Sequence, residues 1–414
     1  MAATDVMRSE PGGERLSAPV IVLIGMCSLI YFLDGLIHSV LGPLAPDLAR
    51  SLSLSNTELG PIFSANLIGQ CIGLVVFPLL ASRVGQRTVV LGSLVGFGLG
   101  QSASALSVGA TDLFMWRLVT GLFLGGALPS CLAIVTAETP AAKRGVAIMM
   151  LFMGYGAGAT VAGLVVAALA NSGGWRAVMV VVGAACIVTA LAAWFWLRIP
   201  VRNGSAQRSA ATAGKESAFG IVSPRYILGT LMLWLLFVAM LTISYCLNSW
   251  LPTLLVEVGR DESLATISVS IFSLGGIVAA LGIGLLIDRF GAMRTLISFV
   301  VTSAVLLFVV GQVLASASTE LLLVLLGACG FFVLGAYGGV NVVLASFYPE
   351  SLRAVGIGWA KSVGRIGTVI APVLIGIGLS AGIAETTVMS LFAVPALIAA
   401  GTLAVIALSA RSAA

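Results

Sequence analysis

The chain has 414 residues, of which 59% are hydrophobic and only 9% are charged, and its mean hydropathy is +1.12. Soluble domains carry about 25% charged residues, so this composition excludes an ordinary soluble protein and predicts one that spans a membrane. The formal charge of +5 does not indicate nucleic-acid binding, because the basic residues are spread over short loops between apolar segments.

Twelve apolar runs are long enough to cross a bilayer, which takes about 20 residues of helix. They predict an all-α membrane protein with twelve transmembrane helices. In chain order the runs cover residues 19–41, 60–81, 88–109, 113–136, 146–168, 174–198, 226–250, 265–287, 295–315, 320–345, 355–381 and 386–408.

The first run follows a mixed-charge N-terminal segment, and its length predicts an uncleaved membrane helix rather than a secretory signal. It contains Asp34 and, one turn later, His38, which is the only histidine. Ionisable groups inside a membrane are costly and usually functional. We expect Asp34 to gain and lose a proton, with His38 as a partner. Alternatively, Asp34 is a structural acid satisfied by an arginine, and His38 is a polar residue near the outer mouth.

Two arginines are predicted inside later spans. Arg117 lies in the fourth run near its outer end, and Arg365 lies in the eleventh, four residues after Lys361. A guanidinium presents a planar fork that suits a carboxylate, so both arginines are candidates to hold an organic anion. Alternatively, Arg117 pairs with Asp34 or extends to the membrane interface, as we expect of Lys361.

Neutral polar and aromatic side chains lie in pairs on three predicted helices. A tyrosine offers an apolar ring face and one hydroxyl, which suits an aromatic ligand. The alternative is ordinary helix packing. The candidate pairs are Tyr245 with Asn248, Tyr337 with Asn341, and Asn66 with Gln70.

The two halves of the chain are predicted to be repeats. Residues 199–222 form the one long polar stretch and indicate a linker (199–225) between an N-terminal half (1–198) and a C-terminal half (226–414). Three alignments at nearly one offset support the repeat: HSVLGPL (38–44) with NSWLPTL (248–254), LLASRVGQRTVV (79–90) with LLIDRFGAMRTL (285–296), and TPAAKRGVAI (139–148) with YPESLRAVGI (348–357).

The distribution of basic residues predicts the orientation in the membrane. About fifteen Lys and Arg residues fall on one side of the twelve spans, and only Arg50, Arg176 and Arg260 fall on the other. Basic loops stay in the cytoplasm. We therefore expect both termini to be cytoplasmic.

Two six-helix repeats of parallel topology are typical of the major facilitator superfamily. The stretch LIDRFGAMR (286–294) resembles that superfamily's G-x-L-x-D-R-x-G-R-R loop. The matching residues are Gly284, Asp288, Arg289, Gly291 and Arg294. The first-half copy keeps Arg83, Gly85 and Arg87 but has Ser82 at the acidic position and Pro78 at the first glycine.

Three longer stretches resemble the aromatic acid:proton symporters of that superfamily. They are RLVTGLFLGGALPSCLAIVTAETP (117–140), NSWLPTLLVEVG (248–259) and YPESLRAVGIGWAKSVGRIGTVIAPVLIG (348–376). The resemblance implies proton-coupled uptake of an aromatic or similar ring-bearing carboxylate across the bacterial inner membrane by alternating access. That family usually carries D-G-x-D in its first helix. Here Ile37 replaces the second acid, and His38 is the candidate to compensate.

Charged residues in the cytoplasmic loops are expected to form an inner gate of salt bridges. The alternative is the ordinary positive charge of cytoplasmic loops. The candidate gate residues are Arg83, Arg87, Glu138, Arg144, Asp288, Arg289, Arg294, Glu350 and Arg353.

No phosphate-binding loop, zinc motif or nucleophile arrangement occurs in the sequence, so we expect no enzymatic activity, no cofactor and no metal. The expected partners are a small organic acid, protons and the lipid bilayer, with no nucleic acid, and the chain is expected to be monomeric. Two rival functions stay open: a proton-driven exporter of drugs or metabolites, and a sensor that binds a ligand without transporting it.

Overall fold

The structure is a computed structural model that describes residues 17–140, 143–197 and 218–412. All regular elements within these ranges are helices. In chain order they are α1 Ala18–Leu52, α2 Asn56–Val84, α3 Gln86–Ala103, η1 Ser104–Leu106, α4 Ala110–Glu138, α5 Arg144–Trp196, η3 Ala218–Val222, α7 Ile227–Glu257, α8 Glu262–Phe290, α9 Ala292–Val313, α10 Thr319–Phe347, α11 Glu350–Ser380, α12 Glu385–Leu391 and α13 Ala393–Ser412.

Twelve helical segments in the described residues are long and apolar enough to cross a membrane, which confirms the predicted number and class. Helix α5 contains two of them, which meet at a kink where Gly174 has a φ of 64°. Directly after this kink, an Asp47 carboxylate oxygen accepts a hydrogen bond from the Trp175 backbone N–H at 3.1 Å. An acid at the start of a helix satisfies a free N–H and complements the helix dipole. Helices α12 and α13 together form the twelfth span.

The first helix extends well beyond its predicted end. Helix α1 continues to Leu52, eleven residues beyond the predicted end at residue 41, and includes Pro43 and Pro46. Those prolines interrupt the backbone hydrogen bonding without ending the helix, because the segment is buried against neighbouring helices. Most of the predicted linker lies outside the described residues, and its end contains η3.

The two copies of the glycine-containing loop adopt the same backbone conformation. Gly85 joins α2 to α3 with a φ of 87°, and Gly291 joins α8 to α9 with a φ of 86°. Glycine adopts positive φ without a steric penalty. Each glycine therefore lets the chain reverse direction at a single residue between two long helices.

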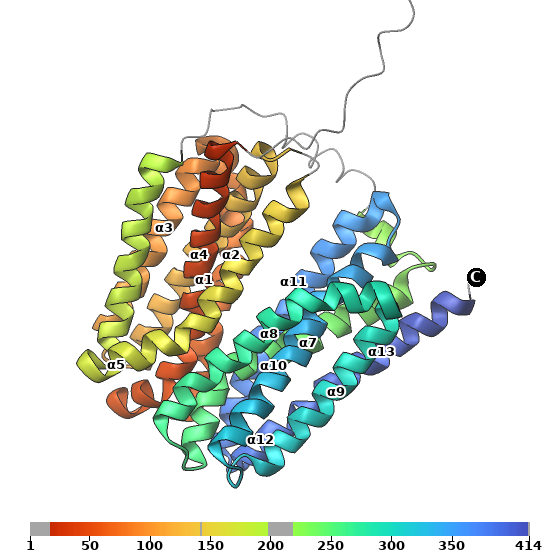
Figure 1. Ribbon diagram of the computed structural model, residues 1–414. Helices are drawn as coiled ribbons and strands as arrows, with labels where there is room; N and C mark the ends of the chain where they lie inside the picture. Colours follow the sequence, from red (N-terminus) through yellow and green to blue (C-terminus); the bar gives the residue numbers. More distant parts are fainter. Residues whose placement is uncertain (1–16, 141–142, 198–217, 413–414) are drawn as a thin grey trace, which may run out of the picture.

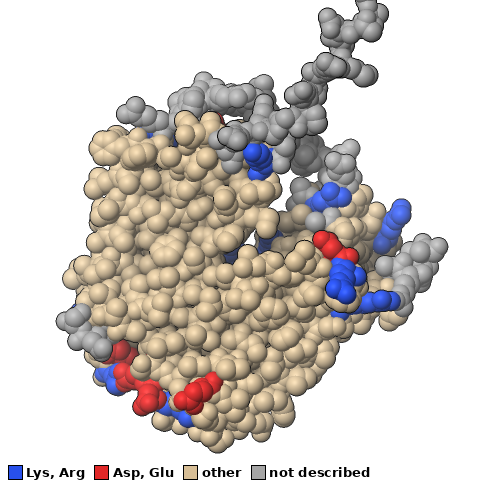
Figure 2. All heavy atoms as spheres, in the orientation of Figure 1, with Lys and Arg blue, Asp and Glu red and all other residues tan. Residues whose placement is uncertain are grey.

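The helices form two bundles, α1–α5 and α7–α13 (Figure 1). We call the end with the α2–α3 and α8–α9 junctions the basic end, because the exposed residues Arg83, Arg289 and Arg294 lie there. Helices α1 and α7 finish at the other end, which we call the opposite end. Figure 2 shows a hollow between the bundles that opens toward the basic end, with Lys or Arg atoms visible inside it.

The bundles touch closely at the opposite end, where α1 meets α7, α2 meets α11 and α5 meets α8. Glycines make these crossings possible, because any added Cβ would collide with a facing carbonyl oxygen. Such a Cβ would lie 2.2 Å from the oxygen of Asn248 at Gly42, 2.7 Å from that of Pro372 at Gly60, and 2.2 Å from that of Thr266 at Gly163.

Polar contacts add to this closure. Arg50 of α1 forms an ion pair with Glu262 of α8. Three hydrogen bonds also join the bundles: Asn56 Nδ2 to Glu257 Oε1 at 2.8 Å, Thr57 Oγ1 to Ser380 Oγ at 2.7 Å, and Ser64 Oγ to the Val369 carbonyl oxygen at 2.6 Å. The structure is therefore closed at the opposite end and open at the basic end.

Candidate functional site

A buried carboxylate and an imidazole lie together in the middle of α1. Asp34 is 2% exposed, and its Oδ1 lies 3.6 Å from Nδ1 of His38. Both oxygens of Asp34 and both ring nitrogens of His38 are buried without a hydrogen-bond partner in the part of the chain that the structure describes. The pair becomes an ion pair when His38 is protonated and Asp34 is not. This arrangement can therefore hold one or two protons between two groups of one helix.

Three tyrosines from both bundles surround this pair. The His38 ring lies 5.6 Å from the ring of Tyr245 on α7, edge to face, and 6.3 Å from the ring of Tyr155 on α5. The side chains of Tyr155 and Tyr245 approach each other across the interface between the bundles, and the side chain of Tyr337 on α10 lies near both. Their rings and hydroxyls form an amphipathic surface beside the acid.

A cation completes the site from the second bundle. Arg365 of α11 donates a hydrogen bond from Nη1 to Oε1 of Gln70 on α2, at 2.7 Å, across the interface. The Arg365 guanidinium lies near the hydroxyls of Tyr245 and Tyr337, and the Asp34 carboxylate also lies near that of Tyr245. Among the described residues no carboxylate lies within salt-bridge distance of Arg365. Its charge is therefore available to an anion that enters the hollow.

Arg117 lies elsewhere. Its side chain is 1% exposed inside the first bundle, where Nη1 donates to Oε1 of Gln101 at 2.8 Å and Nη2 donates to the Ile37 carbonyl oxygen at 3.2 Å. Gln101 in turn donates to the sulfur of Met179 at 2.9 Å. These contacts connect Arg117 to the backbone of α1 between Asp34 and His38. They do not bring the guanidinium to the hollow, and its role as a ligand for an anion stays a prediction.

The predicted asparagines contribute less directly. Asn341 directs its amide to its own helix, donating to the carbonyls of Tyr337 and Gly338. Asn248 lies where α7 crosses α1, and its backbone oxygen faces Gly42. Asn66 is buried on α2, one turn before Gln70, and neither atom of its amide has a hydrogen-bond partner in the described chain.

The predicted gate residues do not form ion pairs with one another in the described chain. Arg87 donates to the Trp194 carbonyl oxygen at 2.6 Å, Arg144 donates to that of Thr139 at 3.1 Å, and Arg289 stacks over Phe290. Exposed side chains at the basic end are those of Arg83, Asp288, Arg294 and Arg353. Glu138 is partly buried there. The side chain of Glu350 is outside the described part. An inner gate therefore stays a prediction. The structure does not test it, because the basic end is open and the gate would form only when that end closes.

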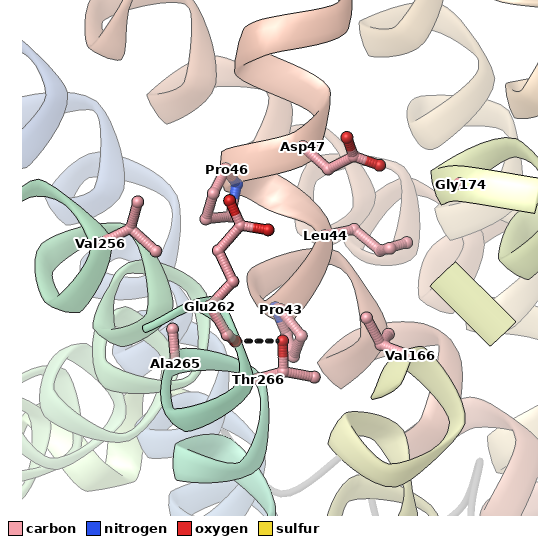
Figure 3. A pocket seen from close by; sticks show the side chains of 10 residues that line it. All are labelled: Pro43, Leu44, Pro46, Asp47, Val166, Gly174, Val256, Glu262, Ala265 and Thr266. Atoms are coloured by element: carbon pink, nitrogen blue, oxygen red, sulfur yellow. Dashed lines mark hydrogen bonds between the residues drawn. The ribbon is translucent and has the colours of Figure 1, made fainter. Parts of the chain in front are cut away.

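A recess lies between the bundles at the opposite end (Figure 3). Its lining comes from α1, α5, α7 and α8 and includes Pro43, Pro46, Asp47, Glu262 and Thr266. The Thr266 hydroxyl donates to the carbonyl oxygen of Glu262, its own helix partner. The recess lies beyond the crossing of α1 and α7 from Asp34, so this crossing separates it from the central tyrosines.

The candidates from the sequence include Asp34, His38, Tyr245 and Arg365 of this central region but not Tyr155. That residue lies in a glycine-rich stretch which reads as helix packing, and the stretch does pack. A Cβ on Gly35 would lie 2.1 Å from the Tyr155 carbonyl oxygen. The same close contact with α1 brings the Tyr155 ring to His38. The signal that could have identified Tyr155 is an aromatic residue within a glycine-rich stretch of helix.

The chain is similar to known transport proteins. The family model of the Major Facilitator Superfamily matches residues 27–267 and 233–413. The 4-hydroxybenzoate transporter PcaK of Pseudomonas putida is 31% identical over 373 residues, covering 83% of each chain. The 3-(3-hydroxy-phenyl)propionate transporter of Escherichia coli (strain K12) is 30% identical over 400 residues, covering 96% of each.

A solved structure shows the same fold. The crystal structure of a D-xylose-proton symporter superposes with a TM-score of 0.78 at 16% identity, covering 93% of this chain and 97% of that one. With twelve apolar helices in the described residues, the chain is a multi-pass membrane transport protein and not an enzyme. It belongs to the major facilitator superfamily, among the transporters related to those of aromatic acids.

Proposed function

We propose that this protein carries an aromatic carboxylate, together with protons, into a bacterial cell by alternating access. The observation that supports this most is Arg365, a cation beside the hollow whose described polar partner is the neutral amide of Gln70. A guanidinium at an interface can hold a carboxylate through two parallel N–H donors. The named relatives transport 4-hydroxybenzoate and 3-(3-hydroxy-phenyl)propionate, which are aromatic anions of this kind.

The ring of the substrate would bind among Tyr155, Tyr245 and Tyr337. These side chains come from three helices and both bundles. Aromatic rings pack edge to face or offset, and each hydroxyl offers one polar contact. The tyrosines therefore suit a flat ring, and a bound ring would contact both halves at once.

Asp34 would be the proton carrier. Its carboxylate is buried beside the His38 imidazole without a hydrogen-bond partner in the described chain, so its charged form is costly. A substrate anion arriving nearby would repel the negative charge of this carboxylate. The loaded, neutralised site could then change its accessibility, and His38 would share the proton in place of the family's second acid.

The basic end would face the cytoplasm, because Lys and Arg concentrate there. With that orientation both termini are cytoplasmic and the structure corresponds to an inward-open state in the inner membrane. Arg117 would act as a positioning residue, since it bonds the backbone of α1 one turn after Asp34. The predicted gate residues would pair when the basic end closes.

The test is uptake by the purified full chain in proteoliposomes. Labelled benzoate or 4-hydroxybenzoate should accumulate when the outside is acidified and should equilibrate without accumulation when no pH gradient is imposed. Export against the same gradient would favour the rival exporter. Binding without any transport would favour a sensor.

A further inference from the structure

Two cations lie one helical turn apart on α11. Lys361 precedes Arg365 by four residues, which places both side chains on one face of the helix. The same face continues to Val369, whose carbonyl oxygen contacts Ser64 of α2 across the interface. This face therefore looks toward the first bundle, and Lys361 lies on the side of Arg365 nearer the basic end.

Lys361 lies where the bundles have separated. Its side chain is exposed, whereas Arg365 is partly buried. One turn earlier, a Cβ added to Gly358 would meet no atom within 4 Å, so open space adjoins this face of α11. Figure 2 shows Lys or Arg atoms inside the hollow. The two cations thus form a short ladder along this face of α11, from the exposed Lys361 to Arg365 at the interface.

The charges of this ladder are not balanced by the protein. Each cation lies within electrostatic range of the other. In the described chain neither has a carboxylate within salt-bridge distance, and Asp34, the acid of the central site, lies nearest to His38. One carboxylate bound at Arg365 would leave Lys361 uncompensated.

We propose that the substrate carries two carboxylates on its ring or on a short chain attached to it, one held by Arg365 and the other by Lys361. This inference rests on the proposed function and deepens it, from an aromatic acid to an aromatic dicarboxylate. Side chains four residues apart on a helix have Cβ atoms about 6 Å apart. The Lys361 and Arg365 side chains are long and flexible, so their charged ends can each reach one carboxylate of a ring that carries two.

Binding to the purified full chain in lipid nanodiscs tests this, using benzene-1,3-dicarboxylate, benzene-1,4-dicarboxylate and benzoate. Wild type should bind at least one diacid about tenfold or more tightly than benzoate, which is the scale of a charge-assisted hydrogen bond. Lys361→Met should lower the ratio of diacid to benzoate affinity about tenfold, and Lys361→Arg should preserve it. Lys143→Met, a lysine change at the start of α5 in the first bundle, should leave the ratio as in wild type.

Each result separates the inference from the proposed function. Benzoate binding as tight as that of both diacids would overturn the inference and leave the proposed function standing. An equal loss of both affinities in Lys361→Met would assign Lys361 to general attraction of anions and also overturn it. If no aromatic acid binds at all, the proposed function fails, and the inference fails with it.

Discussion

The crossing of α1 and α7 allows a direct test of how the two bundles move. We predict that Gly42→Ala disfavours the conformation seen here and favours one in which the opposite end is open. The added Cβ would lie 2.2 Å from the Asn248 carbonyl oxygen, whereas ordinary contact begins at 3.4 Å. The helices must therefore separate by about 1 Å, and overpacking of this kind costs about 1–3 kcal/mol. If the other conformation relieves the clash, its population rises about 5- to 150-fold relative to this one.

A matched control separates conformational bias from loss of stability. Gly154→Ala creates the same 2.2 Å clash, with the Ser28 carbonyl oxygen, but within the first bundle. Because both residues move together, this change should reduce stability without favouring either conformation. Gly25→Ala meets no atom within 4 Å and should do neither. All three changes gain the same helix propensity.

The assay is the distance between spin labels at Val84 and Phe290, exposed residues at the basic ends of the two bundles. In a cysteine-free background, Gly42→Ala should increase the population with a short distance, while both controls should keep the wild-type distribution. Identical distance distributions for Gly42→Ala and Gly154→Ala would refute the prediction that the α1–α7 crossing stabilises the conformation closed at the opposite end.

Four further predictions concern the site and the gate. Arg365→Gln should weaken binding of benzoate-type acids about tenfold or more, since a hydrogen bond to a charged group contributes about 1.5–3 kcal/mol; unchanged affinity in detergent would remove it as the anchor. Asp34→Asn should abolish accumulation driven by a pH gradient in proteoliposomes but keep exchange of labelled for unlabelled substrate, and continued accumulation would make Asp34 structural. His38→Asn should slow uptake without uncoupling it, so loss of gradient dependence would instead make His38 the carrier. Asp288→Asn should impair transport strongly and Ser82→Ala hardly at all, whereas equal, mild effects would contradict an inner gate that depends on the second-half loop.

The fold was largely predictable because a bilayer imposes one simple requirement, a helix of about 20 apolar residues. The twelve runs meet it clearly, and the two loop copies mark the repeat through Gly85 and Gly291. The end of α1 was not predictable from hydropathy. Its last turns contain Pro43 and Pro46 and are stabilised by burial, which depends on other helices.

The site was harder to predict. Counting residues along a helix gives the depth of a side chain in the membrane, but it does not give the neighbouring helix toward which that side chain points. Arg117 lies at about the level of Asp34 along the bundle, as its contact with Ile37 indicates, yet it points toward Gln101 of α3. Arg365 of α11 instead faces the interface between the bundles, where it bonds Gln70. Which of two arginines meets the hollow is a matter of helix rotation, and packing between helices determines that.

The prolines near the crossing of α1 and α7 also affect how the bundles separate. Pro252 has no N–H, so the Asn248 carbonyl oxygen lacks the usual donor four residues on, and Pro46 leaves the Gly42 carbonyl in the same condition. The carbonyl of Asn248 faces the Cα of Gly42 when the bundles touch, a position suited to a weak Cα–H···O interaction. When the bundles part, water can reach these oxygens and donate full hydrogen bonds to them. Hydration of the two carbonyls would then offset part of the free energy needed to separate the helices.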